Sequence, residues 1–339
     1  MNAKPILDDF FKSQERVLEW GVLPAKSPLP HSEHLKSWVK QDHHAGLRYM
    51  QERLEERANP AQLFPWAKSI VLFSLRQSSV FGTNTGDLKV AAYALGEDYH
   101  HLARKILAGA ELSLRENLTQ QTFRFHGFCD TWPVFERDIG AEVGLGWRGK
   151  NACLIHPRHG SGFLLAGFFT DLQLETPTLP LQDFCGQCTA CLDLCPTGAL
   201  IQPGHLDANK CISFWTIEAK GEIPESIATK TQSWIFGCDI CQDVCPWNHK
   251  PKKSGPIADL EKWPKTAFEW LALLRQGGGF QSRFKNTPLL RAGRRSLLRN
   301  VLVALRSRPK AEFTEILDHL AAEETDPIVL DELKKARHP

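Results

Sequence analysis

FCGQCTACLDLCPTGAL, residues 184–200, places four cysteines within eleven positions and follows the last one with a proline. The spacing Cys185-x2-Cys188-x2-Cys191-x3-Cys195 is typical of bacterial 4Fe-4S ligation. A zinc site instead needs two ligand pairs separated by a dozen or more residues. A disulfide scaffold belongs to a small secreted domain, and this chain has 339 residues. The run therefore predicts an iron–sulfur cluster.

A second and shorter run, GCDICQDVCPW, occupies residues 237–247. It supplies three cysteines, because Ile235 stands where the first cysteine of a full run would be. Cys211 is the unassigned cysteine between the two runs. In two-cluster ferredoxins the fourth cysteine of each run ligates the other cluster. That rule predicts two complete 4Fe-4S sites, one held by Cys185, Cys188, Cys191 and Cys245, the other by Cys195, Cys211, Cys238 and Cys241.

Length and composition describe a multidomain globular protein. A chain of this length suggests two or three domains, and 42% hydrophobic and 24% charged residues are ordinary values for such proteins. The first residues, MNAKPILDDFFKSQERVLEWG, contain acidic residues where a signal peptide needs an apolar stretch. The apolar stretch 163–169 is too short to span a bilayer. Ten cysteines without an export signal predict a cytoplasmic protein with no membrane association.

The first 175 residues alternate between helical and extended patterns, which predicts an α/β domain of enzyme size. The expected helices are 31–57, 98–117 and 133–144, and the expected strands are 69–75, 121–129, 152–156 and 162–169. The turn GLGWRGKN at 144–151 does not follow a strand as a dinucleotide fingerprint requires. Its Arg148 and Lys150 either meet a ligand or are solvated cations of a tight connection.

The C-terminal region carries a strong charge asymmetry. Nine basic residues and no acidic one lie between Arg283 and Lys310, although the whole chain has a net charge of only +2. Apolar residues repeat here at helical spacing, and Arg295, Arg299 and Arg306 are predicted to share another face. Such a face is either simply solvated or binds phosphates, and a structured RNA substrate would favour the second role. The chain turns acidic after Lys310, where an RNA contact should end.

Several motifs together resemble the epoxyqueuosine reductase family over about residues 30–300. They are YALGEDYHHLARK (93–105), DTWPVFERDIGAEVGLGWRGKN (130–151), FFTDLQL (168–174), CGQCTACLDLCPTGAL (185–200), CISFWTIEAKGEIPE (211–225) and GCDICQDVCPWN (237–248). The resemblance implies a cobalamin-dependent reductase with two 4Fe-4S clusters. Its implied reaction removes the epoxide oxygen of epoxyqueuosine at the wobble position of tRNA, with electrons from an external donor of the flavodoxin or ferredoxin type.

The resemblance also implies a multidomain organisation of mixed α/β and α+β class, in a chain expected to be monomeric. We expect a nitroreductase-like cobalamin-binding domain over 1–175 and a ferredoxin-like two-cluster domain over 176–255. A helical-repeat domain that contacts tRNA is expected over 256–339.

Asp130 is the residue at which the family's proton-donating aspartate falls. A carboxylic acid donates a proton at neutral pH when apolar surroundings raise its pKa, and Phe128, Trp132 and Phe135 are the expected surroundings. The alternative is that Asp130 caps the helix expected to start at Pro133. Trp132 stands where family members have a small residue, which leaves the shape of the pocket open.

The remaining candidates are implied by their place in the family's motifs. The residues expected near cobalamin, besides Asp130, are Arg57, Tyr93, Lys150, His156 and Ser213. Cys129 and Cys153 lie outside the cluster sets and are expected to be buried thiols, although Cys129 is close enough to Asp130 to approach the cofactor.

Two other functions stay open at the level of sequence. One is a cobalamin-dependent reductase of a small molecule, similar to reductive dehalogenases, against which the missing export signal and the basic tail argue. The other is an electron-transfer protein without catalytic activity, in which residues 1–175 serve for docking. Bound corrinoid would exclude the second alternative, and affinity for tRNA would exclude the first.

Overall fold

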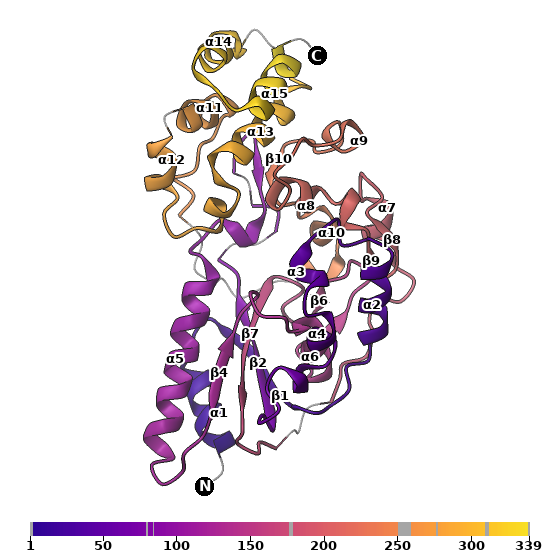
Figure 1. Ribbon diagram of the computed structural model, residues 1–339, viewed down its shortest axis with the longest axis vertical. Helices are drawn as coiled ribbons and strands as arrows, with labels where there is room; N and C mark the ends of the chain where they lie inside the picture. Colours follow the sequence, from indigo (N-terminus) through magenta and orange to yellow (C-terminus); the bar gives the residue numbers. More distant parts are fainter. Residues whose placement is uncertain are drawn as a thin grey trace.

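The molecule is elongated, with a sheet domain at one end and a group of helices at the other (Figure 1). The cysteine-rich segment lies beside the junction of these two parts. The computed structural model describes residues 3–78, 81–83, 85–175, 179–249, 259–275, 277–308 and 312–337. Within these residues no helix is both long enough and apolar enough to cross a membrane.

A four-stranded sheet organises the N-terminal domain. Its strands are β1 (Val17–Pro24), β2 (Ser69–Arg76), β4 (Phe125–Phe128) and β7 (Phe163–Thr170), in the order β1-β2-β7-β4. Every neighbouring pair is antiparallel. The alternation of helices and strands had predicted an α/β domain, but antiparallel pairing places this domain in the α+β class. The two central strands are the predicted strands 69–75 and 162–169.

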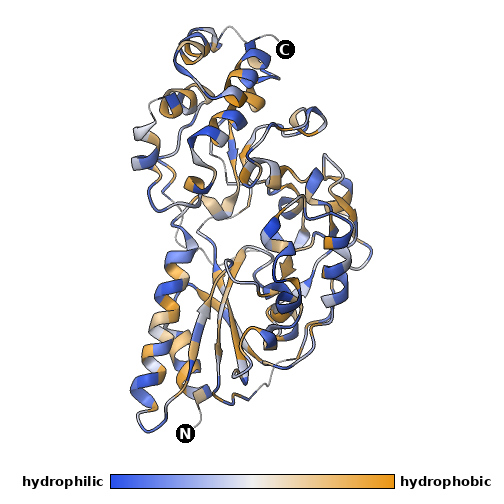
Figure 2. Cartoon of the chain, viewed as in Figure 1, coloured by the Kyte–Doolittle hydropathy of each residue, from blue (hydrophilic) through white to orange (hydrophobic). Residues whose placement is uncertain are grey.

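Helices cover both faces of the sheet. Helices α1 (Ala3–Ser13) and α5 (Tyr99–Asn117) pack on one face, where Leu7 and Ala110 meet Phe73 and Phe168. Helices α2 (Ser32–Lys40), α4 (Leu54–Ala58) and α6 (Glu136–Glu142) lie on the other side (Figure 1). Figure 2 shows the central strands as largely hydrophobic, whereas α5 carries both hydrophobic and hydrophilic residues. Because both faces are covered, the central strands read as continuous apolar runs rather than alternating ones.

Element boundaries differ from the sequence expectations at several points. The helix expected over 31–57 is interrupted after α2 and continues as α3 (Arg48–Gln51) and α4. Asp42, Ala45 and Gly46 adopt positive φ angles in the interruption, which ends a right-handed helix. The strand expected over 152–156 shrinks to β6 (Leu154–Ile155), paired with β5 (Trp147–Arg148). Sequence reasoning did not single out α1 or β1.

The cysteine-rich segment consists of short elements, because its turns are shaped around the thiols. They are α7 (Ala190–Asp193), β8 (Leu200–Gln202), β9 (His205–Leu206), α8 (Ile212–Ile217), α9 (Glu225–Ala228), β10 (Trp234–Phe236) and α10 (Ile240–Asp243). Strand β10 pairs in parallel with β3 (Lys89–Val90), which comes from the N-terminal part of the chain. This pairing joins two of the expected domains through backbone hydrogen bonds.

Within the described residues, five α-helices form the C-terminal part, and α13 is their centre. They are α11 (Ala267–Arg275), α12 (Gly278–Arg283), α13 (Gly293–Leu305), α14 (Thr314–Glu323) and α15 (Pro327–Arg337). Their core also takes in Leu88 and Leu95 from the N-terminal part and Phe236 from β10. Packing therefore crosses the expected divisions of the chain. The predicted boundaries after 175 and after 255 fall beside or among residues outside the described ones, as does Lys310.

Candidate active site

A cavity of about 630 Å³ lies where residues from all three parts of the chain meet. Its lining contains the three tyrosines of the entire chain, Tyr49, Tyr93 and Tyr99. The other lining residues are Glu52, Arg53, Arg57, Asp130, Thr131, Pro133, Leu164, Glu218 and Arg291. Concentration of aromatic hydroxyls and charged groups in one concave site marks it as the candidate active site.

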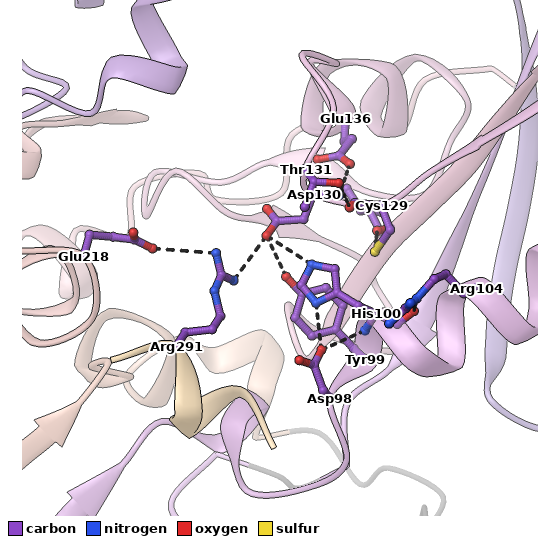
Figure 3. Close-up of polar contacts among 11 residues, drawn as sticks. Asp98, Tyr99, His100, Arg104, Cys129, Asp130, Thr131, Glu136, Glu218 and Arg291 are labelled. Atoms are coloured by element: carbon purple, nitrogen blue, oxygen red, sulfur yellow. Dashed lines mark hydrogen bonds and ion pairs between the residues drawn. The ribbon is translucent and has the colours of Figure 1, made fainter. Parts of the chain in front are cut away.

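Asp130 lies at the centre of a polar network in this cavity (Figure 3). It follows strand β4 and adopts a left-handed φ of 58°. Its Oδ2 accepts a hydrogen bond of 2.9 Å from the Tyr99 hydroxyl and lies 3.3 Å from Arg291 Nη1. His100 Nε2 lies 3.5 Å from the same oxygen. The backbone amide of Asp130 donates to Glu136 Oε1 at 2.8 Å, which holds the strained residue in place.

The start of α5 aims two of these partners at Asp130. Asp98 caps the helix by accepting the His100 amide at 3.0 Å. The same carboxylate lies 2.7 Å from His100 Nδ1, so it orients the imidazole with Nε2 toward Asp130. Tyr99 stacks on the His100 ring with centroids 4.2 Å apart. Local capping therefore delivers both a hydroxyl and an imidazole to the catalytic candidate.

These contacts decide where the proton resides. Burial acts to raise the pKa of Asp130, but hydrogen bonds from His100 and Tyr99 and the charge of Arg291 outweigh it and lower the pKa to about 2. Hydrogen bonds to Asp130 and Asp98 raise the pKa of His100 to about 9. At neutral pH the aspartate is ionised and the histidine carries the proton. The expectation that apolar neighbours raise the pKa of Asp130 is wrong.

The expected apolar neighbours point elsewhere. Phe128 and Phe135 are buried in the core beneath the sheet. Trp132 packs edge-on against His126, with centroids 4.2 Å apart, and contacts Phe64 at 5.6 Å. Its bulk therefore fills an aromatic cluster and is not part of the cavity lining.

The helix-capping alternative for Asp130 is also wrong. Helix α6 begins at Glu136 rather than at Pro133, and its capping position is Phe135, which makes no side-chain cap. Burial raises the pKa of Glu136 to about 8, and the charge of Asp130 adds to the shift. The Glu136 carboxyl group is therefore protonated at neutral pH and accepts the hydrogen bond from the Asp130 backbone amide.

Arg57 and Tyr93 line the cavity, as expected for residues near a cofactor. Arg57 is buried, and its guanidinium donates to the carbonyls of Tyr49 at 3.0 Å and Val134 at 3.4 Å. Its buried Nε has no hydrogen-bond partner among the described residues. Burial raises the pKa of the Tyr93 hydroxyl, which therefore stays protonated and able to donate.

Lys150, His156 and Ser213 do not line this cavity. Lys150 Nζ donates to the carbonyls of Gly186 at 2.6 Å and Cys188 at 3.0 Å, so it braces the first cysteine loop. His156 is buried and stacks on His159, while the amide of Ser213 hydrogen-bonds the Cys211 thiol. Lys150 and Ser213 contact the cysteine loops, and the expected place of these three residues near the cofactor stays a prediction.

The turn 144–151 is a tight connection between α6 and the β5–β6 hairpin. Arg148 Nη1 donates to the buried carboxylate of Asp138 at 2.7 Å. Arg148 and Lys150 both have partners within the chain, which fits the tight-connection interpretation of this turn.

The first group of thiols surrounds a separate cavity of about 360 Å³. Its cysteines are Cys185, Cys188, Cys191 and Cys245. Burial, together with the neighbouring thiols of Cys185, Cys245 and Cys188, raises the pKa of Cys191 to about 11. Trp147 Nε1 donates to Cys185 Sγ at 3.3 Å. These four are the set that the crossed assignment predicted, and the cavity between them fits a cluster.

The second group forms around Cys241. Burial raises the pKa of Cys241, and the thiols of Cys153, Cys211, Cys238 and Cys195 add to the effect. Cys211 thus joins the group from outside both runs, as the missing ligand at Ile235 required. None of the ten cysteines forms a disulfide. Cys153 lies beside this group, and Cys129 is buried with its thiol 3.5 Å from the Leu165 carbonyl.

Arg299 does not belong to an exposed basic face. It is only 1% exposed, in the middle of α13. Its guanidinium donates to the carbonyls of Trp215 at 2.7 Å and Ala219 at 2.9 Å and also contacts the Gly221 carbonyl. The predicted phosphate contact is wrong for this residue, because its donors bind carbonyls that close the α8–α9 connection.

The other two predicted RNA contacts are ion-paired. Arg306 is 13% exposed at its side chain and pairs with Glu225 at 2.6 Å and with the buried Glu332. Arg295 is 45% exposed and pairs with Asp326 at 2.7 Å. The three arginines therefore do not form one open basic surface, and Arg295 is the member most accessible to a ligand.

Comparison with known proteins accounts for this combination of cavity and thiol groups. The family described as 4Fe-4S double cluster binding domain matches residues 184–248, and the one described as Epoxyqueuosine reductase QueG, DUF1730 matches residues 57–131. The epoxyqueuosine reductase of Cyclobacterium marinum is 38% identical over 79% of this chain and 86% of the relative. This chain belongs to the epoxyqueuosine reductase family. It is accordingly an oxidoreductase with a double 4Fe-4S cluster domain.

Other members of the epoxyqueuosine reductase family extend the similarity. The Pseudomonas aeruginosa enzyme is 36% identical over 82% of this chain and 79% of the relative. An epoxyqueuosine reductase solved with an epoxyqueuosine-modified stem loop of tRNA-Tyr superposes with a TM-score of 0.81, at 27% identity over 99% of both chains. The Streptococcus thermophilus enzyme shares the fold with a TM-score of 0.86, at 24% identity over 98% of this chain and 87% of that one.

Proposed function

We propose that this reductase converts epoxyqueuosine to queuosine at the wobble position of tRNA, in the cavity around Asp130. The observation that carries the proposal is the proton-loaded pair of Asp130 and His100 in a cavity of a reductase of this family. A relative solved with an epoxyqueuosine-modified stem loop supports RNA as the substrate. A relative from Bacillus subtilis has an aspartate on a catalytic loop of its active site, which supports Asp130 as the acid.

The overall reaction takes up two electrons and two protons, and the epoxide oxygen leaves as water. One proton is needed when the first carbon–oxygen bond breaks, and the second when the resulting hydroxyl group departs. Asp130 Oδ2 faces the cavity and hands over the first proton, which it draws from His100 Nε2 at 3.5 Å. His100 then reloads from solvent and serves the second transfer. Positioned acids of this kind contribute about 10²- to 10⁴-fold in rate.

Cobalamin is the proposed cofactor of the cavity, and the residues present fit such a group. Arg57 and Tyr93 both line the cavity. The buried Nε of Arg57 has no hydrogen-bond partner among the described residues, and the Tyr93 hydroxyl stays protonated. Both suit a ligand rich in amide groups, which accepts such donors. Reduced cobalamin, when bound, supplies the nucleophile for an epoxide carbon. The tyrosines and arginines of the lining orient the substrate and exclude water around it.

The two sets of cysteines are the proposed ligands of the clusters. Cys185, Cys188, Cys191 and Cys245 would hold one 4Fe-4S cluster, and Cys195, Cys211, Cys238 and Cys241 the other. When bound, the clusters supply single electrons received from an external donor of the flavodoxin or ferredoxin type. Lys150 ties the first cysteine loop to the turn after α6.

The remaining features of the organisation are also proposals. We infer a cofactor domain over 1–175 of nitroreductase-like fold, a cluster domain over 176–255 and a C-terminal domain over 256–339 built as a helical repeat. The packing of α11 and α15 against α13, and of α14 against α11 and α15, supports the last of these. A cytoplasmic monomer that contacts tRNA through Arg295 completes the proposal.

The test is anaerobic reconstitution of the full chain with iron, sulfide and cobalamin, followed by single-turnover reaction with tRNA that contains epoxyqueuosine. We expect the visible spectra of both clusters and corrinoid, and queuosine among the nucleosides of the digested tRNA. Loaded protein that leaves epoxyqueuosine unchanged would overturn the proposal and point to a small-molecule substrate. Protein that takes up clusters but no corrinoid would point to electron transfer alone.

A further inference from the structure

Arg291 connects the C-terminal helices directly to the candidate proton donor. It ends the 3-10 helix η5 (Pro288–Arg291), just before α13. Its Nη1 lies 3.3 Å from Asp130 Oδ2, and its Nη2 lies 4.0 Å from Glu218 Oε1 (Figure 3). Arg291 and Asp130 are separated by 161 positions in the sequence. The contact is therefore purely tertiary and lies at the junction of the domains.

Arg291 differs from the arginines that follow it. Arg294 pairs with Glu324 at 2.9 Å and Arg295 pairs with Asp326 at 2.7 Å, both within the C-terminal helices. Arg299 is buried among carbonyls. Of these four arginines, Arg291 is the one that lines the cavity and touches the catalytic carboxylate.

The Arg291–Asp130 ion pair is poorly suited to the proposed reaction, but Arg291 is well suited to exchange Asp130 for another anion. A cation beside Asp130 favours the ionised carboxylate, whereas an acid must be protonated to donate. The two side chains are 40% and 45% exposed, and exposed ion pairs change an equilibrium constant only a few-fold. A guanidinium binds phosphate through the same fork with which it binds carboxylate.

We propose that Arg291 exchanges partners when RNA binds, leaving Asp130 for a backbone phosphate of the RNA. This inference rests on the proposed function and adds a specificity device to it. Asp130 then retains Tyr99 and His100 as neighbours, and loss of the nearby cation makes its carboxyl easier to protonate. The acid is therefore fully competent only when a polynucleotide is in place. A free nucleoside, which lacks flanking phosphates, leaves the pair closed.

A double-mutant cycle tests the exchange without any catalytic step. The protein is the full chain with its clusters and without cobalamin, and the probe is an unmodified anticodon stem-loop RNA. If Asp130 competes with phosphate for Arg291, Asp130→Asn should tighten binding about three- to fivefold. The same change made in the Arg291→Gln background should have no effect. Asparagine tolerates the left-handed φ of 58°, so the variant keeps the local backbone.

A salt titration gives a second, independent measurement. Arg291→Gln should reduce the slope of log K against log salt by roughly 0.7 to 0.9, the amount expected for one lost phosphate contact. Arg275→Gln is the matched control, because Arg275 is 34% exposed and ion-paired to Glu323 but lies outside the cavity. The control should leave both slope and affinity unchanged.

The outcomes separate this inference from the proposed function. If Asp130→Asn increased RNA affinity equally in the wild-type and Arg291→Gln backgrounds, the effect would be general repulsion between Asp130 and RNA. That result would overturn the exchange. An unchanged salt slope in Arg291→Gln would overturn it as well, even if the wild-type protein reduces epoxyqueuosine in tRNA. Absence of any RNA binding by the wild type would overturn both the exchange and the proposed RNA substrate.

Discussion

The cysteine segment, 184–248, and the arginine segment, 283–308, were both interpreted from residue spacing, with opposite outcomes. In the first, the thiols gather into the two groups that spacing predicts, including Cys211 from outside both runs. In the second, arginines predicted to share a face are separated. Arg299 is buried, Arg306 is ion-paired beside a buried glutamate, and Arg295 stays accessible.

The difference lies in what spacing constrains. Thiols two or three residues apart on a tight loop must lie within a few ångströms of one another, whatever the rest of the chain does. Arginines at helical spacing share a direction, but their environment depends on the element that packs against them. Here α8 and its following loop cover Arg299 with carbonyls. A ligand pattern therefore carries more structural information than a charge pattern.

Cys211→Ala tests the assignment of the cysteines and should have the largest effect of the substitutions considered. We expect the loss of one whole cluster, about four of eight irons, with the other retained, because Cys211 is the proposed ligand that neither run supplies. Iron and sulfide content together with electron paramagnetic resonance would measure it. Cys129→Ala is the matched control, since that thiol lies outside both groups. A Cys211→Ala protein with full iron content and unchanged spectra would contradict the assignment.

Asp130→Asn tests a residue whose catalytic role is a prediction and whose environment differs from the expected apolar one. We expect single-turnover reduction to slow by about 10²-fold or more, because the amide cannot transfer a proton. Cluster and cobalamin content, measured on the same sample, should be normal since asparagine keeps the size and the left-handed backbone. Near-normal turnover by the fully loaded variant would remove Asp130 from the mechanism.

Arg299→Met tests whether the buried arginine of α13 stabilises the fold. It leaves the Trp215, Ala219 and Gly221 carbonyls without their donor, and disruption of such buried polar groups costs about 3 to 5 kcal/mol. Arg299→Lys should not rescue it, because an ammonium cannot reach several carbonyls as a planar fork does. Thermal unfolding would measure the loss of stability. Arg295→Met is the exposed control, and its free energy of unfolding should stay within about 0.5 kcal/mol of the wild type. Equal stability of the two Met variants would contradict a structural role for Arg299.

Glu136→Gln should change how stability depends on pH. Because burial raises the pKa of Glu136 to about 8, the folded protein binds a proton that the unfolded chain releases near pH 4.5. This contribution is fully present below pH 4.5 and is lost as the pH rises through about 8. Glutamine keeps an acceptor for the Asp130 amide and removes the titration, so the unfolding midpoint should fall less between pH 5 and 8. An identical pH profile for both proteins would contradict a raised pKa.

Arg295→Gln is expected to have the smallest effect. It is half-exposed and already paired with Asp326, so at most one phosphate contact is lost. The slope of log K against log salt for stem-loop RNA should fall by less than about 0.9. Arg275→Gln serves again as the reference, and equal slopes for the two variants would mean that Arg295 is only solvated.

The active site was predictable in part. The motif around Asp130 pointed to the acid, and Tyr99 and His100 lie in a stretch that already resembled the family. Their roles were missed because two adjacent residues at a helix start give no sign of what they face. Arg291 was missed for a different reason: it approaches Asp130 from a segment 161 positions away. Tyr49 lies only 8 positions before Arg57, and its contact with that residue was not foreseen. That all three tyrosines of the chain would line one cavity left no trace in their spacing.

The sequence by itself determined the cluster chemistry, the family and the candidate acid, because these depend on residue identities at short separations. Only the tertiary structure decided the protonation of the site and the separate fates of the arginines. Both depend on groups that folding brings together from separate segments: 31 positions separate Tyr99 from Asp130, 161 separate Arg291 from Asp130, and 84 separate Trp215 from Arg299. Electrostatic interactions act through distance in space, and a pattern along the chain does not report that distance.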